Sequence, residues 1–182
     1  MDDLFERSRA RGAEARAHVV RSATAAGVTI MSHDDRSEAH VDQAVAEGIH
    51  VSEFPTTVSA ARRARMAGMK IVAGAPNYVR GGSQSGNVAV AELIAEGLVD
   101  ALASDYVPRS LLDAAFRLAA DTALPHDLPA AVALVTDAPA RIAGLNDRGR
   151  IAEGLRADLV AVRLSGGQPV VQAAWREGRQ VY

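Results

Sequence analysis

The 182-residue sequence contains no cysteine, which excludes disulfide bonds and thiolate metal sites together. A metal ion bound by these residues must therefore be held by His, Asp, Glu or a modified side chain. Aromatic residues are scarce, at 4% of the chain, and Lys70 is the only lysine.

The sequence also lacks a strong charge of one sign and a long apolar run. Its 20 basic and 22 acidic residues give a formal net charge of -2, so nothing indicates a nucleic-acid surface or a membrane-binding patch. No apolar run approaches the roughly 18 residues of a membrane span, and the first 25 residues are too rich in Arg, Glu and Asp for a signal peptide. We expect a cytoplasmic protein whose partner is a small soluble substrate, not nucleic acid or a membrane.

What the chain does contain is an internal repeat. In each copy an alanine-rich amphipathic stretch ends at a glycine, which suits a helix C-terminus, and a short apolar run follows. The copies cover residues 26–33, 47–53, 67–74 and 96–105. This order of helix, glycine and strand predicts parallel βα units.

The repeat predicts an α/β fold, of which two forms are possible. Ser37 and Thr57 are suitable N-caps for helices over 38–47 and 58–67, and Pro108 opens a third helix over 109–120. A doubly wound open sheet would give the same pattern as a barrel. Because a complete eight-unit barrel needs roughly 250 residues, a barrel of this length would be partial, with about four units.

Polar residues gather where the predicted strands end, as in barrel enzymes. The strand ends carry His33, Glu53 and Asp105, and a histidine with two carboxylates on one rim suits a divalent metal ion. Alternatively, such residues are turn residues or helix caps, a reading that applies to Asp34, Asp35 and Glu53. Asp105 lies too far before the helix at Pro108 to cap it.

A thirteen-residue segment, 75–87, is predicted to be a long loop between a strand and a helix beginning near Val88. Its candidate ligand-binding residues are Arg80, Gly81, Gly82, Ser83, Ser85 and Asn87. Glycine amides, hydroxyl groups and a guanidinium can cradle phosphate oxygens, although a flexible lid has the same composition.

Several motifs together resemble the amidohydrolase superfamily, and within it the phosphonate-pathway (C-P lyase pathway) branch. The similar blocks are 31–35 (MSHDD), 52–57 (SEFPTT), 74–77 (GAPN), 80–83 (RGGS) with 85–87 (SGN), and 102–108 (LASDYVP), in the same order and with similar spacing. The tail, from 139–145 (PARIAGL) to 154–160 (GLRADLV), is similar to the ending of many amidohydrolases.

The resemblance implies a divalent-metal barrel, with zinc, manganese or a similar ion. In it His33 is a metal ligand, and Asp105 binds metal and takes a proton from the attacking water. Glu53 stands where many relatives place a histidine ligand. The implied substrate is alpha-D-ribose 1-methylphosphonate 5-triphosphate, which loses diphosphate, and the implied substrate-binding residues are Asp34 and the six residues of the 80–87 segment named above.

Two departures from the family pattern bear on activity. Gln84 stands where the family has His, so a possible ligand or proton donor is absent. No His-x-His pair precedes His33, and Lys70, which lies in a later predicted strand, is not a candidate bridging lysine.

These features predict a C-terminal half of a barrel. We expect residues 1–26 to form a linking helix, 27–144 to form the half-barrel and 145–182 to form part of a small β-sandwich. Exposed barrel edges would favour a homodimer or another association. Three functions remain open: a diphosphatase of phosphonate catabolism, another amidohydrolase such as a cyclic amidase or deacetylase, and a non-catalytic fragment that needs a partner chain.

Overall fold

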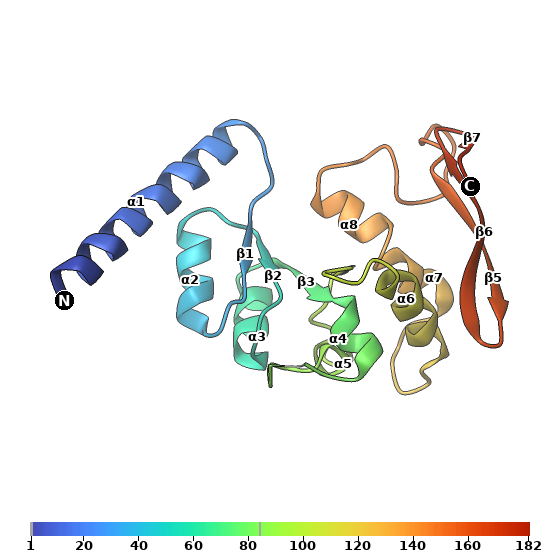
Figure 1. The fold of residues 1–182 in the computed structure, drawn as a ribbon, viewed down its shortest axis with the longest axis horizontal. Coiled ribbons are helices and arrows are strands. Elements are labelled where there is room, and N and C mark those ends of the chain that lie inside the picture. Colours follow the sequence, from blue (N-terminus) through green and yellow to red (C-terminus); the bar gives the residue numbers. More distant parts are fainter. Residues whose placement is uncertain (1, 84) are drawn as a thin grey trace.

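The computed structural model describes residues 2–83 and 85–182, with side chains from residue 11 onward. Its centre is a four-stranded parallel sheet in the order β1-β2-β3-β4 (Figure 1). The strands are β1 (Met31–His33), β2 (Val51–Glu53), β3 (Lys70–Gly74) and β4 (Ala101–Ala103). Between and after them lie α2 (Glu38–Ala46), α3 (Val58–Met66), α4 (Ala75–Arg80), α5 (Val90–Ala95) and α6 (Ser110–Ala120).

Capping residues begin two of the helices where the sequence predicts. The Ser37 hydroxyl accepts a hydrogen bond from the amide of His40, and the Thr57 hydroxyl accepts one from the amide of Ala60. Each bond satisfies an amide that has no partner within its own helix. The predicted starts of α2 and α3 are therefore confirmed.

The two faces of the sheet are covered differently. On one face Ile71 is fully buried with small residues of the outer helices, such as Ala44 and Ala61. On the other face Val51, Val72 and Ala101 form a small cluster against α8 (Asp137–Ile142). Sequential strand order, with the βα helices packed on one face, is the winding of a barrel, whereas a doubly wound sheet reverses its order at a switch point.

The prediction that residues 75–87 form one continuous loop is wrong, because the first six of them form α4. Pro76 occupies one of the first helical positions, where its missing amide costs nothing, and Gly81 ends the helix with φ 84°. The following helix, α5, begins at Val90, near the expected position. The helices α7 (Leu128–Ala133) and α8 were not predicted.

The C-terminal part forms a separate antiparallel sheet of β5 (Leu159–Ser165), β6 (Gln168–Arg176) and β7 (Arg179–Gln180) (Figure 1, right). Trp175 pairs with Leu159 on one side and with Gln180 on the other. Strands β6 and β7 form a hairpin with its turn at Glu177 and Gly178.

The N-terminal helix α1 (Asp2–Ala25) projects from the body of the molecule (Figure 1). Val20 packs against the core, and the Arg16 guanidinium donates to both carboxylate oxygens of Glu47, the residue that follows α2, at 2.9 and 2.7 Å. The division of the chain at residues 26 and 144 remains a prediction.

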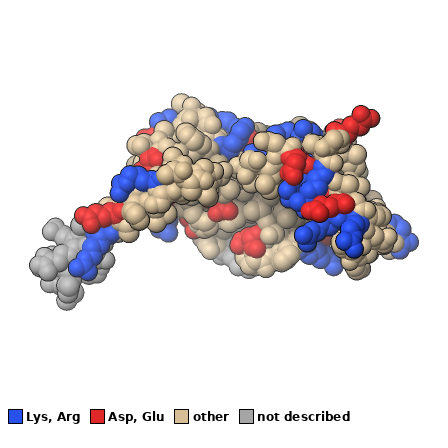
Figure 2. Space-filling model, turned by 90° about the horizontal axis from the view of Figure 1, so that it is seen from above, with Lys and Arg blue, Asp and Glu red and all other residues tan. Residues whose placement is uncertain are grey.

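Two surface properties bear on partners. Within the described residues, no helix has both the length and the apolar character that crossing a membrane requires. Figure 2 shows basic and acidic side chains side by side at the end of the molecule opposite α1.

Candidate active site

Two candidate ligands meet at the carboxyl end of the parallel sheet. His33 ends β1 and Glu53 ends β2, and the register pairs these residues directly. The His33 Nε2 atom lies 3.8 Å from Glu53 Oε2, while its Nδ1 atom lies 3.3 Å from Asp34 Oδ2. An imidazole and a carboxylate from neighbouring strands therefore lie side by side at this edge.

The backbone takes an unusual conformation within two residues of the end of three of the strands. Asp34, Phe54 and Asp105 have φ values of 57°, 55° and 49°. Positive φ is uncommon for residues other than glycine, and such residues cluster at functional sites when the surrounding structure holds them. Here the amide of Asp34 donates to the Glu53 carbonyl, and the amide of Phe54 donates to the Val72 carbonyl. The ends of β1 and β2 are thus each bonded to the next strand at the point where the chain turns.

A cavity of about 180 Å³ opens beside this rim. It brings together six residues that the sequence singled out: Asp34, Arg80, Ser83, Ser85, Asn87 and Asp105. Gly81 and Gly82 lie in the same segment but do not line the cavity. Gln84 lies outside the described residues. The cavity therefore combines two carboxylates with one guanidinium and several hydrogen-bonding groups.

Asn77 and Tyr106, which were not predicted as site residues, hold the cavity wall in place. The Asn77 side chain donates to the Val88 carbonyl at 3.1 Å and accepts from the Val90 amide at 3.0 Å, so it links α4 to α5. The Arg80 guanidinium donates to the Tyr106 hydroxyl at 2.9 Å. The only sequence signal for either residue is its place inside a strand-end block beside a candidate.

Burial and a nearby carboxylate raise the pKa of one tyrosine next to this wall. Tyr78, on α4, has its pKa raised by burial first and then by Asp121, whose Oδ2 atom lies 3.5 Å from the tyrosine hydroxyl. Because α4 and α6 pack together around this residue, Tyr78 connects the cavity wall to the outer helices.

His33 and Glu53 fit part of a divalent-metal site. Imidazole nitrogen and carboxylate oxygen are ordinary ligands of zinc and manganese. Asp105 lines the adjoining cavity, but in the part of the chain that the structure describes no three His, Cys, Asp or Glu residues gather closely enough to hold an ion. These strands therefore supply a pair of neighbouring ligands.

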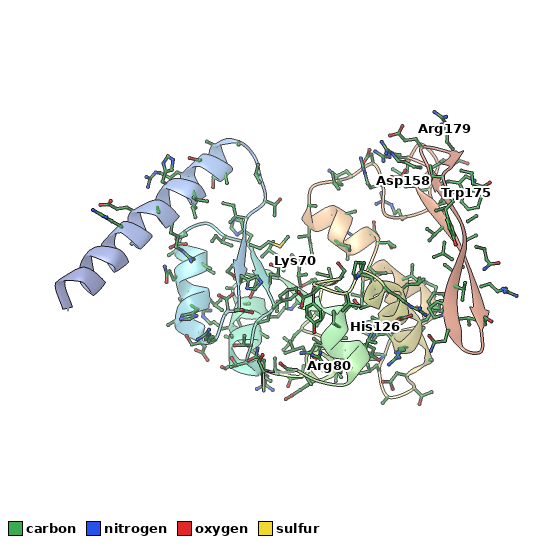
Figure 3. All side chains as sticks on the ribbon, in the orientation of Figure 1. Lys70, Arg80, His126, Asp158, Trp175 and Arg179 are labelled. Carbon is green, nitrogen blue, oxygen red and sulfur yellow. The ribbon has the colours of Figure 1, made fainter. Side chains whose placement is uncertain are left out.

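Lys70 lies away from this site. It begins β3, whereas Arg80 ends α4, and Figure 3 shows the two side chains apart. The Lys70 ammonium lies 3.1 Å from Asp100 Oδ1 at the amino end of the sheet. Lys70 thus belongs to a structural ion pair.

Comparison with known proteins identifies the lineage. The model of the amidohydrolase family matches residues 1–182. Over 155 residues the chain is 50% identical to alpha-D-ribose 1-methylphosphonate 5-triphosphate diphosphatase of Escherichia coli (strain K12), covering 85% of this chain and 41% of that protein. The chain therefore spans about two fifths of the length of this curated relative.

Solved structures show the same fold at low sequence identity. An amidohydrolase from Thermotoga maritima superimposes with a TM-score of 0.63 and 23% identity over 84% of this chain and 43% of its own. A prolidase in complex with N-methylphosphonate-L-proline has a TM-score of 0.64 and 22% identity over 91% of this chain and 48% of its own. The parallel sheet is thus part of a barrel of the amidohydrolase type, and the chain belongs to the amidohydrolase family.

Proposed function

We propose that this chain carries the later-strand part of a metal-dependent hydrolase that releases diphosphate from alpha-D-ribose 1-methylphosphonate 5-triphosphate. The observation that carries the proposal is the His33–Glu53 pair next to a cavity containing Arg80, Ser83 and Asp105. The 50% identity to a diphosphatase of that specificity supports the choice of substrate.

Charge and hydrogen bonding in the cavity suit a polyphosphate. A guanidinium binds phosphate oxygens through two parallel hydrogen bonds, and Arg80 is held toward the cavity by the Tyr106 hydroxyl. Ser83 and Asn87 line the same wall and can donate further hydrogen bonds. The Asp34 carboxylate would repel phosphate, so we propose that it accepts hydrogen bonds from the hydroxyl groups of the ribose.

The reaction adds water across the anhydride bond that joins the first and second phosphates, leaving a 5-phosphate on the ribose. His33 and Glu53 would hold the divalent ion, which when bound would supply Lewis-acid activation of water and would offset charge on the phosphoryl oxygens. Asp105 accepts the proton of the attacking water, which is a role for a carboxylate that reaches the reacting atom.

The test is diphosphate release by the purified chain with manganese or zinc present, together with its bound-metal content. We expect His33→Ala to lower metal content and activity by at least about a hundredfold, as loss of a catalytic-metal ligand implies. His18→Ala, on the exposed surface of α1, is the matched control and leaves both unchanged. A purified chain that binds no metal and releases no diphosphate would refute the proposal for this chain.

A further inference from the structure

Asp35 is a buried carboxylate that the proposed chemistry does not use. It follows β1 by two residues and is 4% exposed. Its Oδ2 atom accepts hydrogen bonds from the hydroxyls of Ser32 and Ser52, both at 2.6 Å. Burying a carboxylate costs free energy of folding unless its oxygens are hydrogen-bonded, and the two serine hydroxyls supply these bonds to Asp35.

The two serines place Asp35 directly behind the candidate ligands. Ser32 on β1 pairs in register with Ser52 on β2, and the next pair along the strands is His33 with Glu53. Successive side chains of a strand point to opposite faces, so the serines face the helices while His33 and Glu53 face the other side. One carboxylate oxygen therefore joins the two strands one residue before each ligand.

The backbone of Asp35 extends this connection to the turns. Its carbonyl accepts from the amide of Thr56 at 2.9 Å and from the Thr56 hydroxyl at 3.3 Å. The turns so joined contain Asp34 and Phe54, both with positive φ. An unfavourable backbone conformation persists only where its surroundings hold it, and the contacts of Asp35 supply that restraint.

We propose that Asp35 is a positioning residue that sets the separation and orientation of His33 and Glu53 by joining the ends of β1 and β2. Its relevance to catalysis rests on the function proposed above for those two residues. The effect of Asp35 on the geometry of His33 and Glu53 does not rest on that function, and it can be measured in the metal-free protein.

Three variants isolate this role. Asp35→Ala removes the acceptor, and the double variant Ser32→Ala with Ser52→Ala removes both donors while keeping the carboxylate. Asp35→Asn keeps an amide oxygen that can accept both hydroxyls. Asp137→Asn is the matched control, because Asp137 is also a buried, hydrogen-bonded carboxylate, at 8% exposed, but lies at the start of α8.

The metal-free proteins are compared by proton NMR through the cross-relaxation signal between the rings of His33 and Phe54. The ring centroids lie 5.4 Å apart in an edge-to-face arrangement. We expect the signal in the unmodified chain, Asp35→Asn and Asp137→Asn, and its loss in Asp35→Ala and the double serine variant. Manganese titrations of the same proteins should show affinity lowered about tenfold or more only in the last two.

Each outcome decides between the alternatives. If Asp35→Ala and the double serine variant keep the ring signal, or if Asp137→Asn loses it as they do, Asp35 contributes general stability and the positioning role is overturned. If Asp35→Ala does not fold, the ring signal of the double serine variant tests the positioning role in its place. An unmodified chain that shows the ring signal but binds no manganese would refute the proposed metal site and leave the positioning of His33 and Glu53 by Asp35 supported.

Discussion

At the scale of single residues, Asp100 connects the beginnings of β3 and β4 through one carboxylate. Its Oδ2 atom accepts from the amide of Ile71 at 2.9 Å, and the charged groups of Arg65 and Lys70 lie 2.9 and 3.1 Å from its oxygens. Burial by itself would raise the pKa of Asp100. The hydrogen bonds from Ile71, Arg65 and Lys70 outweigh burial and hold the pKa below the ordinary value of 3.8.

Because this pKa is lower in the folded chain than in the unfolded one, the stabilisation is present above pH 3.8 and is lost as pH falls through the folded value. We expect Asp100→Asn to lower the free energy of unfolding at pH 7 by about 1–3 kcal/mol. The difference from the unmodified chain should shrink at pH values below the folded pKa. Urea unfolding across this pH range measures both quantities.

Asp42→Asn provides the comparison, because Asp42 forms an exposed ion pair with Arg63. Exposed pairs contribute about 0–1 kcal/mol, so this variant should change little. A loss of stability in Asp100→Asn that does not vary with pH would contradict the electrostatic explanation.

The sequence predicts single residues well where strand geometry alone determines their place. His33 and Glu53 meet because parallel strands end at one edge, which the βα repeat implies. The Asp35 network was not predicted, because it depends on the turn after β1, which brings the Asp35 carboxylate back to Ser32 and Ser52. Tyr106 was missed for a similar reason, since its contact with Arg80 crosses 26 positions of the sequence.

At the scale of elements, the N-cap of α3 tests how much one side chain stabilises the start of a helix. The Thr57 hydroxyl accepts from the Ala60 amide at 3.1 Å and donates to the Arg36 carbonyl at 3.2 Å. We expect Thr57→Ala to lower the free energy of unfolding by about 1 kcal/mol, and Thr57→Ser to retain most of it. Thermal unfolding followed by circular dichroism measures the loss, and equal losses in both variants would show that the methyl group, not the hydroxyl, is responsible.

Most elements with local signals were predicted, and those that depend on packing were not. Ser37 and Thr57 begin their helices through their own side chains, so the sequence reveals them. The six-residue helix α4 lies in a segment rich in loop-forming residues, and it is stabilised by Asn77, which reaches the backbone of residues 88 and 90. The short helix α8 likewise depends on the core, against which Ala140 is buried. The short helix α7 does have a local signal that was missed, because the Asp127 carboxylate accepts a hydrogen bond from the Ala130 amide at 2.9 Å and caps its start.

At the scale of the whole molecule, the two outer strands of the parallel sheet differ. The amide of Leu102 on β4 donates to the carbonyl of Leu134 at 2.8 Å, so the turn that follows α7 already covers part of that edge. Across the face that carries Val51, a cavity of about 610 Å³ is lined by Val28, Ile30 and Ile142 as well as by polar residues. Apolar surface of this kind favours association, so the homodimer expected from exposed barrel edges stays a prediction, with this face on the β1 side as its contact.

A charge placed in that cavity tests the association. Val28 is 59% exposed and lines the cavity, so Val28→Glu should keep the fold and weaken self-association, because a carboxylate would have to be buried at the contact. Val45→Glu is the control, since Val45 is exposed on the outer helix α2. Sedimentation equilibrium over a range of concentrations should show a rising average mass for the unmodified chain and for Val45→Glu, and a constant monomer mass for Val28→Glu. A monomeric unmodified chain would exclude a second copy as the partner of this face, and association unaffected by Val28→Glu would place the contact elsewhere.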